Sequence, residues 1–232
     1  VFPELFLSGY EPDRAQQLAL APGDEPLRVI AEAARQHGIA VLVGFVERVA
    51  PDVVANAVAC FDADGEWRGS YRKTHLFGEH ERAAFAPGDA LFLPKLAGLR
   101  VGPLVCFDVE FPEPARALAS AGAELLVTVA ANMEPYGPDH ALAARARALD
   151  NRLPHIYVNR VGEQSGLRFV GGSAAIAAGG APLAQLGDGE AVATVELPVG
   201  AAAPADVDYL AHVRVGLPVH AVSSSSVRGG SR

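Results

Sequence analysis

The segment from Leu99 to Ser120, LRVGPLVCFDVEFPEPARALAS, carries an apolar stretch, a cysteine and a helix-forming stretch in close succession. The apolar stretch, residues 99–107, predicts a buried strand. Residues 111–120 predict a helix, and Pro112 falls in its first turn, where the missing N–H costs little. Cys106 therefore lies at a predicted strand-to-helix turn.

The same alternation of strands and helices continues on both sides of this segment. Residues 26–37 predict a helix that ends at Gly38, and Asp64-Gly65 predicts the turn of a hairpin. Further strands are predicted over residues 39–46, 56–61, 66–72, 124–130, 155–161, 173–177 and 191–197, and further helices over residues 139–152 and 206–213. This order predicts an α/β fold in which helices cover mixed sheets.

The composition favours a globular protein that binds neither nucleic acid nor a membrane. Half of the 232 residues are hydrophobic, and 19 basic against 27 acidic side chains give a net charge of −8, without the basic patch of a nucleic-acid binder. The longest uncharged stretch, residues 169–187, is too rich in glycine for a membrane span and predicts two strands and a turn. Because no secretory signal is visible and only Cys60 and Cys106 are present, we expect a cytoplasmic location with free thiols.

Both ends of the chain depart from the domain pattern. Residues 1–7, VFPELFL, predict the end of a buried strand that runs into a loop, with nothing before it to begin a domain. We therefore expect N-terminal material to be missing. Residues 223–232 predict a flexible polar tail, so that one domain is expected over residues 1–222.

Cys106 is the sharpest candidate for chemistry. A helix N-terminus and a nearby cation both favour the reactive thiolate, whereas a buried structural cysteine is the commoner case. Glu4, after an apolar run, and Lys73, where a hairpin strand ends, are further ionisable groups at strand ends. Each alone fits a surface or capping charge. Together with Cys106 they predict a site, because α/β sheets bind ligands at the carboxyl ends of their strands.

Three blocks of this sequence resemble the signature blocks of the carbon–nitrogen hydrolases, the nitrilase superfamily. They are FPE at residues 2–4, YRKTHLF at residues 71–77 and VCFDVEFPE at residues 105–113. Later blocks of the family are resembled by Asn132 and by residues 147–152 and 159–162, so the likeness extends to about Leu217. Three blocks in the right order are a more specific signal than one short motif.

The resemblance implies a four-layer α-β-β-α sandwich and a catalytic triad of Glu4, Lys73 and Cys106. A second glutamate is expected before a Phe-x-Pro-Gly element; residues 85–88, FAPG, set the register and point to Glu81, with Glu79 the weaker choice. Family members generally have one further βα unit before the first block, which agrees with an incomplete N-terminus. The resemblance also implies a homodimer or larger homo-oligomer, and neither a metal nor an organic cofactor.

The chemistry implied is cysteine-dependent hydrolysis of a small carboxylic amide through a thioester. Glu4 would act as the base for the thiol of Cys106, because a weak nucleophile needs one. Lys73 and the backbone N–H of Phe107 would stabilise the oxyanion. Glu81 would orient Lys73 and position the substrate amide.

The substrate class is less sharply indicated. Branches of the family that act on nitriles tend to have Trp-Glu where this chain has Phe107-Asp108, which favours an amide; N-carbamoyl amines and nitriles stay as alternatives. Glu110, with Asn132 and Tyr136, predicts a polar or amino-bearing acyl group. Glu110 fits a carboxylate at a helix N-terminus equally well.

Other interpretations of the sequence compete with this one. A Cys-His hydrolase would use His75, His80 or His140 as its base, although no spacing singles one out. The spacings of a helical zinc pair and of phosphate-binding glycine loops are not found. A non-catalytic assembly module is the alternative from another class, since a sheet that lacks a strand exposes an edge. The Ala-rich stretches at 141–148 and 201–205 permit close packing within one chain or between chains.

Overall fold

A computed structural model describes residues 1–199 and 208–218. Two sheets form the framework: one of three strands in the order β1-β2-β3, and one of six in the order β11-β10-β7-β6-β5-β4. Two further strands, β8 and β9, form a separate hairpin. The α/β class is confirmed. The tail predicted over residues 223–232 and the end of the domain predicted over residues 1–222 lie outside the described residues.

The three-stranded sheet is an antiparallel meander with one helix on its outer face. Its strands are β1 (Val41–Ala50), β2 (Val53–Phe61) and β3 (Trp67–Arg72), and α2 (Glu25–His37) ends at Gly38 in the left-handed conformation. Alternate residues of the strands face α2, so that Leu27 and Ala34 of the helix pack with Phe45 of β1. The hairpin and the helix C-cap predicted from the sequence are both confirmed.

The six-stranded sheet has a parallel centre. Its strands are β4 (Lys95–Leu96), β5 (Leu99–Val105), β6 (Leu125–Ala130), β7 (His155–Asn159), β10 (Ala174–Ile176) and β11 (Pro182–Gln185), of which β5, β6 and β7 run parallel. The helices α4 (Pro112–Ser120) and α5 (Gly137–Asn151) connect these parallel strands. Leu104 and Leu126 face α4 and pack with its Leu118.

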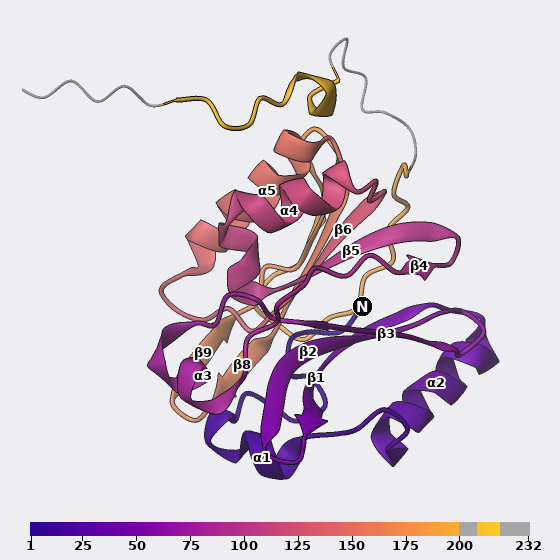
Figure 1. The fold of residues 1–232 in the computed structure, drawn as a ribbon, viewed down its shortest axis with the longest axis vertical. Coiled ribbons are helices and arrows are strands. Elements are labelled where there is room, and N and C mark those ends of the chain that lie inside the picture. Colours follow the sequence, from indigo (N-terminus) through magenta and orange to yellow (C-terminus); the bar gives the residue numbers. More distant parts are fainter. Residues whose placement is uncertain (200–207, 219–232) are drawn as a thin grey trace, which may run out of the picture.

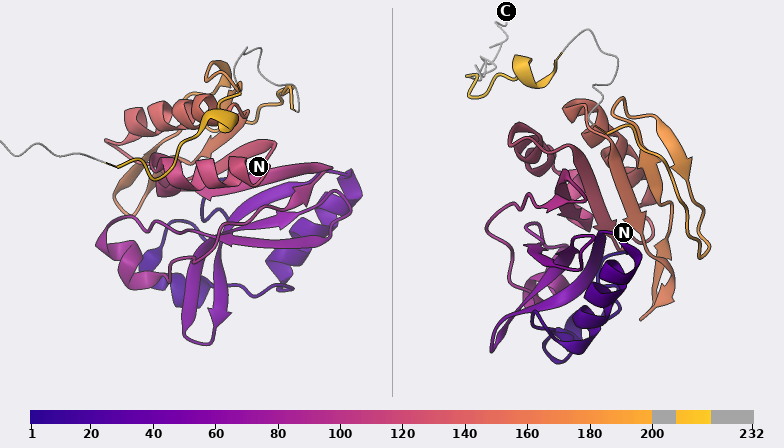
Figure 2. Two further views of the ribbon diagram at one scale, coloured as in Figure 1. Left: turned by 45° about the horizontal axis from the view of Figure 1, so that its top comes forward. Right: turned by 90° about the vertical axis from the view of Figure 1, so that its right-hand side faces the viewer.

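The two sheets pack against each other through the opposite sets of residues. Val58 and Tyr71 of the small sheet share one buried cluster with Val101, Val105 and Val127 of the large sheet. Because strand residues alternate in direction, each sheet buries one face against its partner and the other against helices. The layers thus run α2, small sheet, large sheet, then α4 with α5 (Figures 1 and 2).

Short elements complete the described chain. They are η1 (Pro12–Arg14), α1 (Ala15–Leu18), α3 (Gly78–Ala84), η2 (Cys106–Glu110), β8 (Val161–Gln164), β9 (Leu167–Val170) and η3 (Leu210–His212), where η denotes a 3-10 helix. Among residues 1–199 and 208–218, no helix is both long and apolar enough to cross a membrane.

Four sequence-based expectations need correction. Residues 1–7 form no strand; Glu4 to Ser8 is a turn. Residues 191–197 form no strand either, because they are largely exposed and pair with no described strand. Of the helix predicted over 206–213, only η3 is found, and residues 206–207 lie outside the described chain. The strand predicted over 99–107 ends at Val105, because Cys106 has a positive φ of 46°.

Candidate active site

Glu4 is positioned by a close crossing of two backbone segments. The N–H of Gly44 in β1 donates to Pro3 O (3.2 Å), and the N–H of Leu7 donates to Gly44 O (3.2 Å). A Cβ atom on Gly44 would lie 2.3 Å from Pro3 O and 2.6 Å from the Cα of Glu4, so this crossing requires glycine. The turn that replaces the predicted strand thus lies directly on β1. It carries the side chain of Glu4 into the interior, where it is fully buried.

Lys73 is positioned at the end of β3 by a second close approach. Its N–H donates to Asn56 O (2.8 Å) and its carbonyl accepts from the N–H of Gly88 (2.8 Å). A Cβ atom on Gly88 would lie 2.3 Å from Arg72 O, so glycine is again required. The element FAPG at 85–88 therefore anchors the end of β3, and α3, which precedes it, carries Glu81 back towards Lys73.

The ammonium of Lys73 lies between two carboxylates. Its Nζ donates to Glu4 Oε1 at 2.8 Å and to Glu81 Oε1 at 2.9 Å. All three side chains are buried, with 0%, 0% and 1% exposure for Glu4, Lys73 and Glu81. The three charges sum to −1 in an environment where an unpaired charge would be costly. Each carboxylate therefore depends on the same ammonium.

Neutral donors complete the coordination of both carboxylates. Asn56 Nδ2 donates to Glu4 Oε1 at 2.6 Å, and the N–H of Ala131 donates to Glu4 Oε2 at 2.7 Å. Tyr10 Oη donates to Glu81 Oε1 at 2.8 Å, and the N–H of Phe77 donates to Glu81 Oε2 at 2.8 Å. These bonds fix the orientation of Glu4 and Glu81 before any ligand binds, which is the preorganisation that a reactive site needs.

Cys106 stands at the turn between β5 and η2. Its left-handed backbone, with φ 46°, is uncommon for a residue other than glycine and costs conformational energy. The Ala131 N–H that bonds to Glu4 also acts to lower the pKa of the Cys106 thiol, although burial outweighs it. Because η2 begins at Cys106, the N–H of Phe107 lies in its first turn and has no partner within the helix.

Asp108 ties this turn to the end of β3. Its Oδ2 accepts from the N–H of Val105 (3.0 Å) and from Tyr71 Oη (2.9 Å). Its Oδ1 accepts from Thr74 Oγ1 (2.8 Å) and from the N–H of His75 (2.9 Å). The segments before Cys106 and after Lys73 therefore share one fully buried carboxylate.

The electrostatics of the cluster keep the resting thiol protonated. Burial raises the pKa of the Cys106 thiol, and the charge of Glu4 raises it further, while Lys73 acts in the opposite direction. Burial alone would lower the pKa of Lys73, but Glu4 and Glu81 outweigh it and hold that pKa well above its usual value. The expectation that this turn favours the thiolate is therefore wrong for the free site. The thiol needs a base to react.

A small pocket opens beside the Cys106 sulfur. Five of the eight residues predicted for the site line it, namely Cys106, Phe107, Glu110, Asn132 and Tyr136, whereas the buried Glu4, Lys73 and Glu81 do not. The lining also includes three residues that sequence reasoning did not assign to it: Phe77, Met133 and His140. Asn132 Nδ2 donates to the carbonyl of Tyr136 (3.1 Å), so its amide helps to shape the wall.

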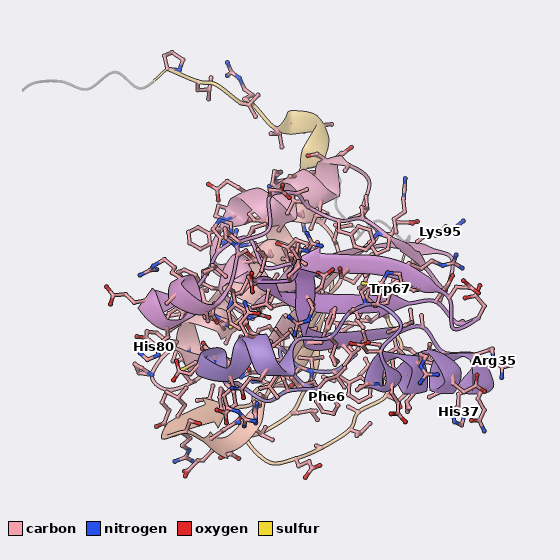
Figure 3. The ribbon with its side chains drawn as sticks, turned by 60° about the horizontal axis from the view of Figure 1, so that its bottom comes forward. Phe6, Arg35, His37, Trp67, His80 and Lys95 are labelled. Carbon is pink, nitrogen blue, oxygen red and sulfur yellow. The ribbon has the colours of Figure 1, made fainter. Side chains whose placement is uncertain are left out.

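The three histidines of the rival hypothesis lie in different settings. His75 stacks on Phe111, with ring centroids 4.0 Å apart, and its Nδ1 lies 2.8 Å from Asp108 Oδ1. His80 is exposed and points away from the body of the protein (Figure 3). His140 does line the pocket, but both ring nitrogens are occupied, Nδ1 by Tyr157 Oη (2.8 Å) and Nε2 by Glu110 Oε1 (3.1 Å). None of the three is placed as a free base for the thiol.

Sequence analysis does not identify Asn56, Tyr10 or Tyr71, because each bonds to a site residue that is distant in the sequence. Asn56 is 52 residues from Glu4, Tyr10 is 71 residues from Glu81, and Tyr71 is 37 residues from Asp108. One signal was available for Asn56, since an amide within the apolar run Val53–Phe61 of β2 needs a partner. Nothing comparable marked Tyr10.

Comparison with known proteins gives a consistent result. A model of the carbon–nitrogen hydrolase family matches residues 1–205. An (R)-stereoselective amidase from a Pseudomonas species is 41% identical over 221 residues, covering 94% of this chain and 80% of that protein.

Solved structures of one amidase, from Nesterenkonia sp. AN1, are also similar. A variant with acrylamide added to its active-site cysteine is 32% identical, covers 92% of this chain and 82% of its own, and has a TM-score of 0.81. A variant in complex with butyramide is 33% identical, covers 80% of this chain and 72% of its own, and has a TM-score of 0.73. The fold and these likenesses define a hydrolase of carbon–nitrogen bonds other than peptide bonds. The chain belongs to the carbon–nitrogen hydrolase family, the nitrilase superfamily.

Proposed function

We propose that this enzyme hydrolyses a small carboxylic amide to a carboxylate and ammonia through a thioester on Cys106. The observation that carries the proposal is the buried ammonium of Lys73, held at 2.8 Å from Glu4 and 2.9 Å from Glu81 beside a protonated thiol. A base, a cation and a nucleophile in one water-poor cluster are the groups that acyl transfer requires.

In the first half-reaction the carboxylate of Glu4 removes the thiol proton as the Cys106 sulfur attacks the amide carbon. The carbonyl double bond opens, and negative charge collects on its oxygen. Lys73 and the N–H of Phe107 stabilise that oxygen; one well-placed donor contributes roughly 3–4 kcal/mol. When the carbonyl re-forms, the carbon–nitrogen bond breaks and Glu4 returns its proton to the leaving nitrogen, which departs as ammonia.

In the second half-reaction a water molecule enters the site that ammonia has left and hydrolyses the thioester. Glu4 takes a proton from this water, the oxygen attacks the thioester carbon, and the carbon–sulfur bond breaks as the thiol recovers its proton. The product is the carboxylate. Glu81 holds Lys73 through a second bond to the same ammonium and positions the substrate amide, and the chemistry uses no metal or organic cofactor.

Three features favour an amide as substrate. The pocket beside Cys106 is narrow and lined mainly by apolar and aromatic side chains, which suits a small acyl group. Phe107-Asp108 stands in place of the Trp-Glu typical of nitrile-hydrolysing branches. The similar Nesterenkonia amidase was solved with butyramide. N-carbamoyl amines and nitriles are the alternatives for the same triad, and a non-catalytic assembly module is the alternative from another class.

Trapping with hydroxylamine tests this proposal. The enzyme incubated with isobutyramide and hydroxylamine should release the hydroxamate, because hydroxylamine intercepts a thioester. The Cys106→Ala variant should release none, whereas Cys60→Ala, which removes the other buried cysteine from β2, should retain the activity. Turnover of nitriles only, or of N-carbamoyl amines only, would overturn the choice of substrate. Absence of hydroxamate with every acyl donor would support the non-catalytic alternative.

A further inference from the structure

One carboxylate in the pocket is not used by the proposed reaction. Glu110 ends the segment η2 that Cys106 begins, so the same short element presents both residues to the pocket. Its side chain is 31% exposed. Within the described residues, Glu110 has no Lys or Arg in ion-pair range, and its single close polar partner is His140 Nε2 at 3.1 Å.

Glu110 is not explained as a helix cap. The N-cap of α4 is Phe111, and no side chain forms a cap hydrogen bond there. Glu110 directly precedes this N-cap, so its charge can interact favourably with the dipole of α4, but no cap hydrogen bond holds it there. Its carboxylate faces the pocket instead.

His140 does not neutralise Glu110. Its ring is 97% buried, since only 3% of the side chain is exposed, and burial lowers the pKa of His140 to about 4. The imidazole is therefore neutral near pH 7. Tyr157 Oη lies 2.8 Å from Nδ1 and occupies the other ring nitrogen. A neutral His140 thus lies 3.1 Å from Glu110 Oε1 through Nε2 without placing a positive charge beside it.

The other residues that line the pocket, apart from Glu110 and His140, carry no charge. Phe77, Phe107, Met133 and Tyr136 are apolar or aromatic, and Asn132 is neutral. Burial, and after it the negative charge of the Asp139 carboxylate, raises the pKa of Glu110, so a cation bound in the pocket would favour the ionised form of Glu110. A substrate in this pocket thus meets one carboxylate that no Lys or Arg of the described residues neutralises.

We propose that Glu110 binds a protonated amino group on the acyl part of the substrate, so that the preferred substrates are small amides of amino acids. This inference rests on the proposed function, because it places the amide carbon at Cys106. The ammonium and the amide carbon of an α-amino amide are separated by one carbon, so a small amide can reach both residues within the pocket that they line. The same charge repels amides whose acyl part carries a carboxylate, so selectivity arises from both attraction and repulsion.

A matched series of amides tests the inference. Alaninamide, isobutyramide and malonamate are small amides with a positive, neutral and negative acyl part at pH 7. The enzyme should show a kcat/KM for alaninamide about tenfold to a hundredfold above that for isobutyramide, the range expected of a charge-assisted contact, and lower activity still with malonamate. Glu110→Gln should bring the ratio of alaninamide to isobutyramide close to one.

Glu113→Gln is the matched control. It removes the same charge three residues further on, at an exposed position in the first turn of α4, and should keep the parental ratio. A parent enzyme that prefers isobutyramide, or a Glu110→Gln variant that keeps the parental ratio, would overturn the inference.

Binding measurements separate this inference from the proposed function. Alaninamide should bind the Cys106→Ala variant about tenfold or more tightly than isobutyramide by calorimetry, and adding Glu110→Gln should abolish the difference. Equal binding would refute the role of Glu110 whether or not any amide is hydrolysed. Hydrolysis of isobutyramide and alaninamide at equal rates would agree with the proposed function and contradict only the role of Glu110 in binding an ammonium group.

Discussion

Lys73 is the residue on which the buried cluster depends. Its ammonium contacts both Glu4 and Glu81, and no other cation of the described chain bonds to either carboxylate. A single site therefore controls the charge balance of three buried groups.

Replacement of Lys73 by methionine should affect both stability and catalysis. Two buried carboxylates would be left unpaired, which should lower the free energy of unfolding by about 3–5 kcal/mol. Loss of the cation near the oxyanion should reduce kcat/KM roughly 10²–10³-fold. Urea unfolding and steady-state kinetics with isobutyramide measure the two effects. Lys95→Met is the control, since Lys95 is exposed at the periphery (Figure 3); equal effects from both variants would contradict the account.

Asp108 should act on the site through position alone. Asp108→Asn replaces one acceptor oxygen by a donor that faces existing donors, among them the N–H of Val105 and Tyr71 Oη. We expect a loss of about 3 kcal/mol of unfolding free energy and a fall in kcat/KM of roughly 10²-fold, because small displacements of reacting groups are costly. Asp52→Asn, at an exposed turn, should change neither quantity. Full activity of Asp108→Asn would show that it does not hold Cys106 in place.

The residues of the cluster differ in how far sequence could identify them. Glu4, Lys73 and Cys106 were assigned through motif resemblance, and the FAPG element gave the register of Glu81; all four lie in one buried cluster. The supporting bonds of Asn56 and Tyr10 could not be predicted, because they depend on which strands and turns become neighbours in the folded chain. His140 was considered only as a base, since its burial against Glu110 has no signature in the sequence.

At the level of elements, the crossing of residues 3–5 over β1 is the feature most sensitive to change. A methyl group at Gly44 would lie 2.3 Å from Pro3 O, so one of the two backbones must move. Gly44→Ala should displace Glu4 and lower kcat/KM roughly 10²-fold, as measured with isobutyramide. Gly179→Ala is the control, because a Cβ atom there meets nothing within 4 Å. Unchanged activity in Gly44→Ala would show that Glu4 tolerates a shifted backbone.

Strands and helices of the interior were predicted closely, whereas the segments at the ends of the domain were not. The apolar runs of β1, β2, β5, β6 and β7 have the burial that their composition predicts. Residues 191–197 also have strand-forming residues, but Val192 is 98% exposed and no described strand pairs with it. Strand propensity does not specify a partner, and residues 1–7 show the same limit.

At the level of the whole molecule, a buried histidine links stability to pH. His155 lies between Thr128 Oγ1 (2.8 Å) and the carbonyl of Ala144 (2.9 Å), so it joins β6, β7 and α5. Burial lowers its pKa from 6.5 to about 4. Between these values the unfolded chain binds a proton that the folded chain does not, so the unfolded state is favoured as the pH falls.

The free energy of unfolding should therefore decrease by up to about 3 kcal/mol between pH 6.5 and pH 4 through His155. Urea titrations across this range measure the slope. His155→Gln should reduce the slope, while His37→Gln, at the exposed end of α2, should keep it. His140 has the same pKa direction and cause, so part of the slope should persist. Identical slopes for the parent and His155→Gln would contradict this assignment.

Self-association into a homodimer or larger homo-oligomer stays a prediction of the family resemblance.

Mass spectrometry of the acyl-enzyme tests the central claim most directly. The enzyme is mixed with isobutyramide, quenched in acid, and analysed as intact protein and as peptides. We predict an isobutyryl group on Cys106 in the parent and in Cys60→Ala, none in Cys106→Ala, and a sharply reduced amount in Glu4→Gln. Product formation with the acyl group on another residue, or with undiminished acylation in Glu4→Gln, would contradict the account.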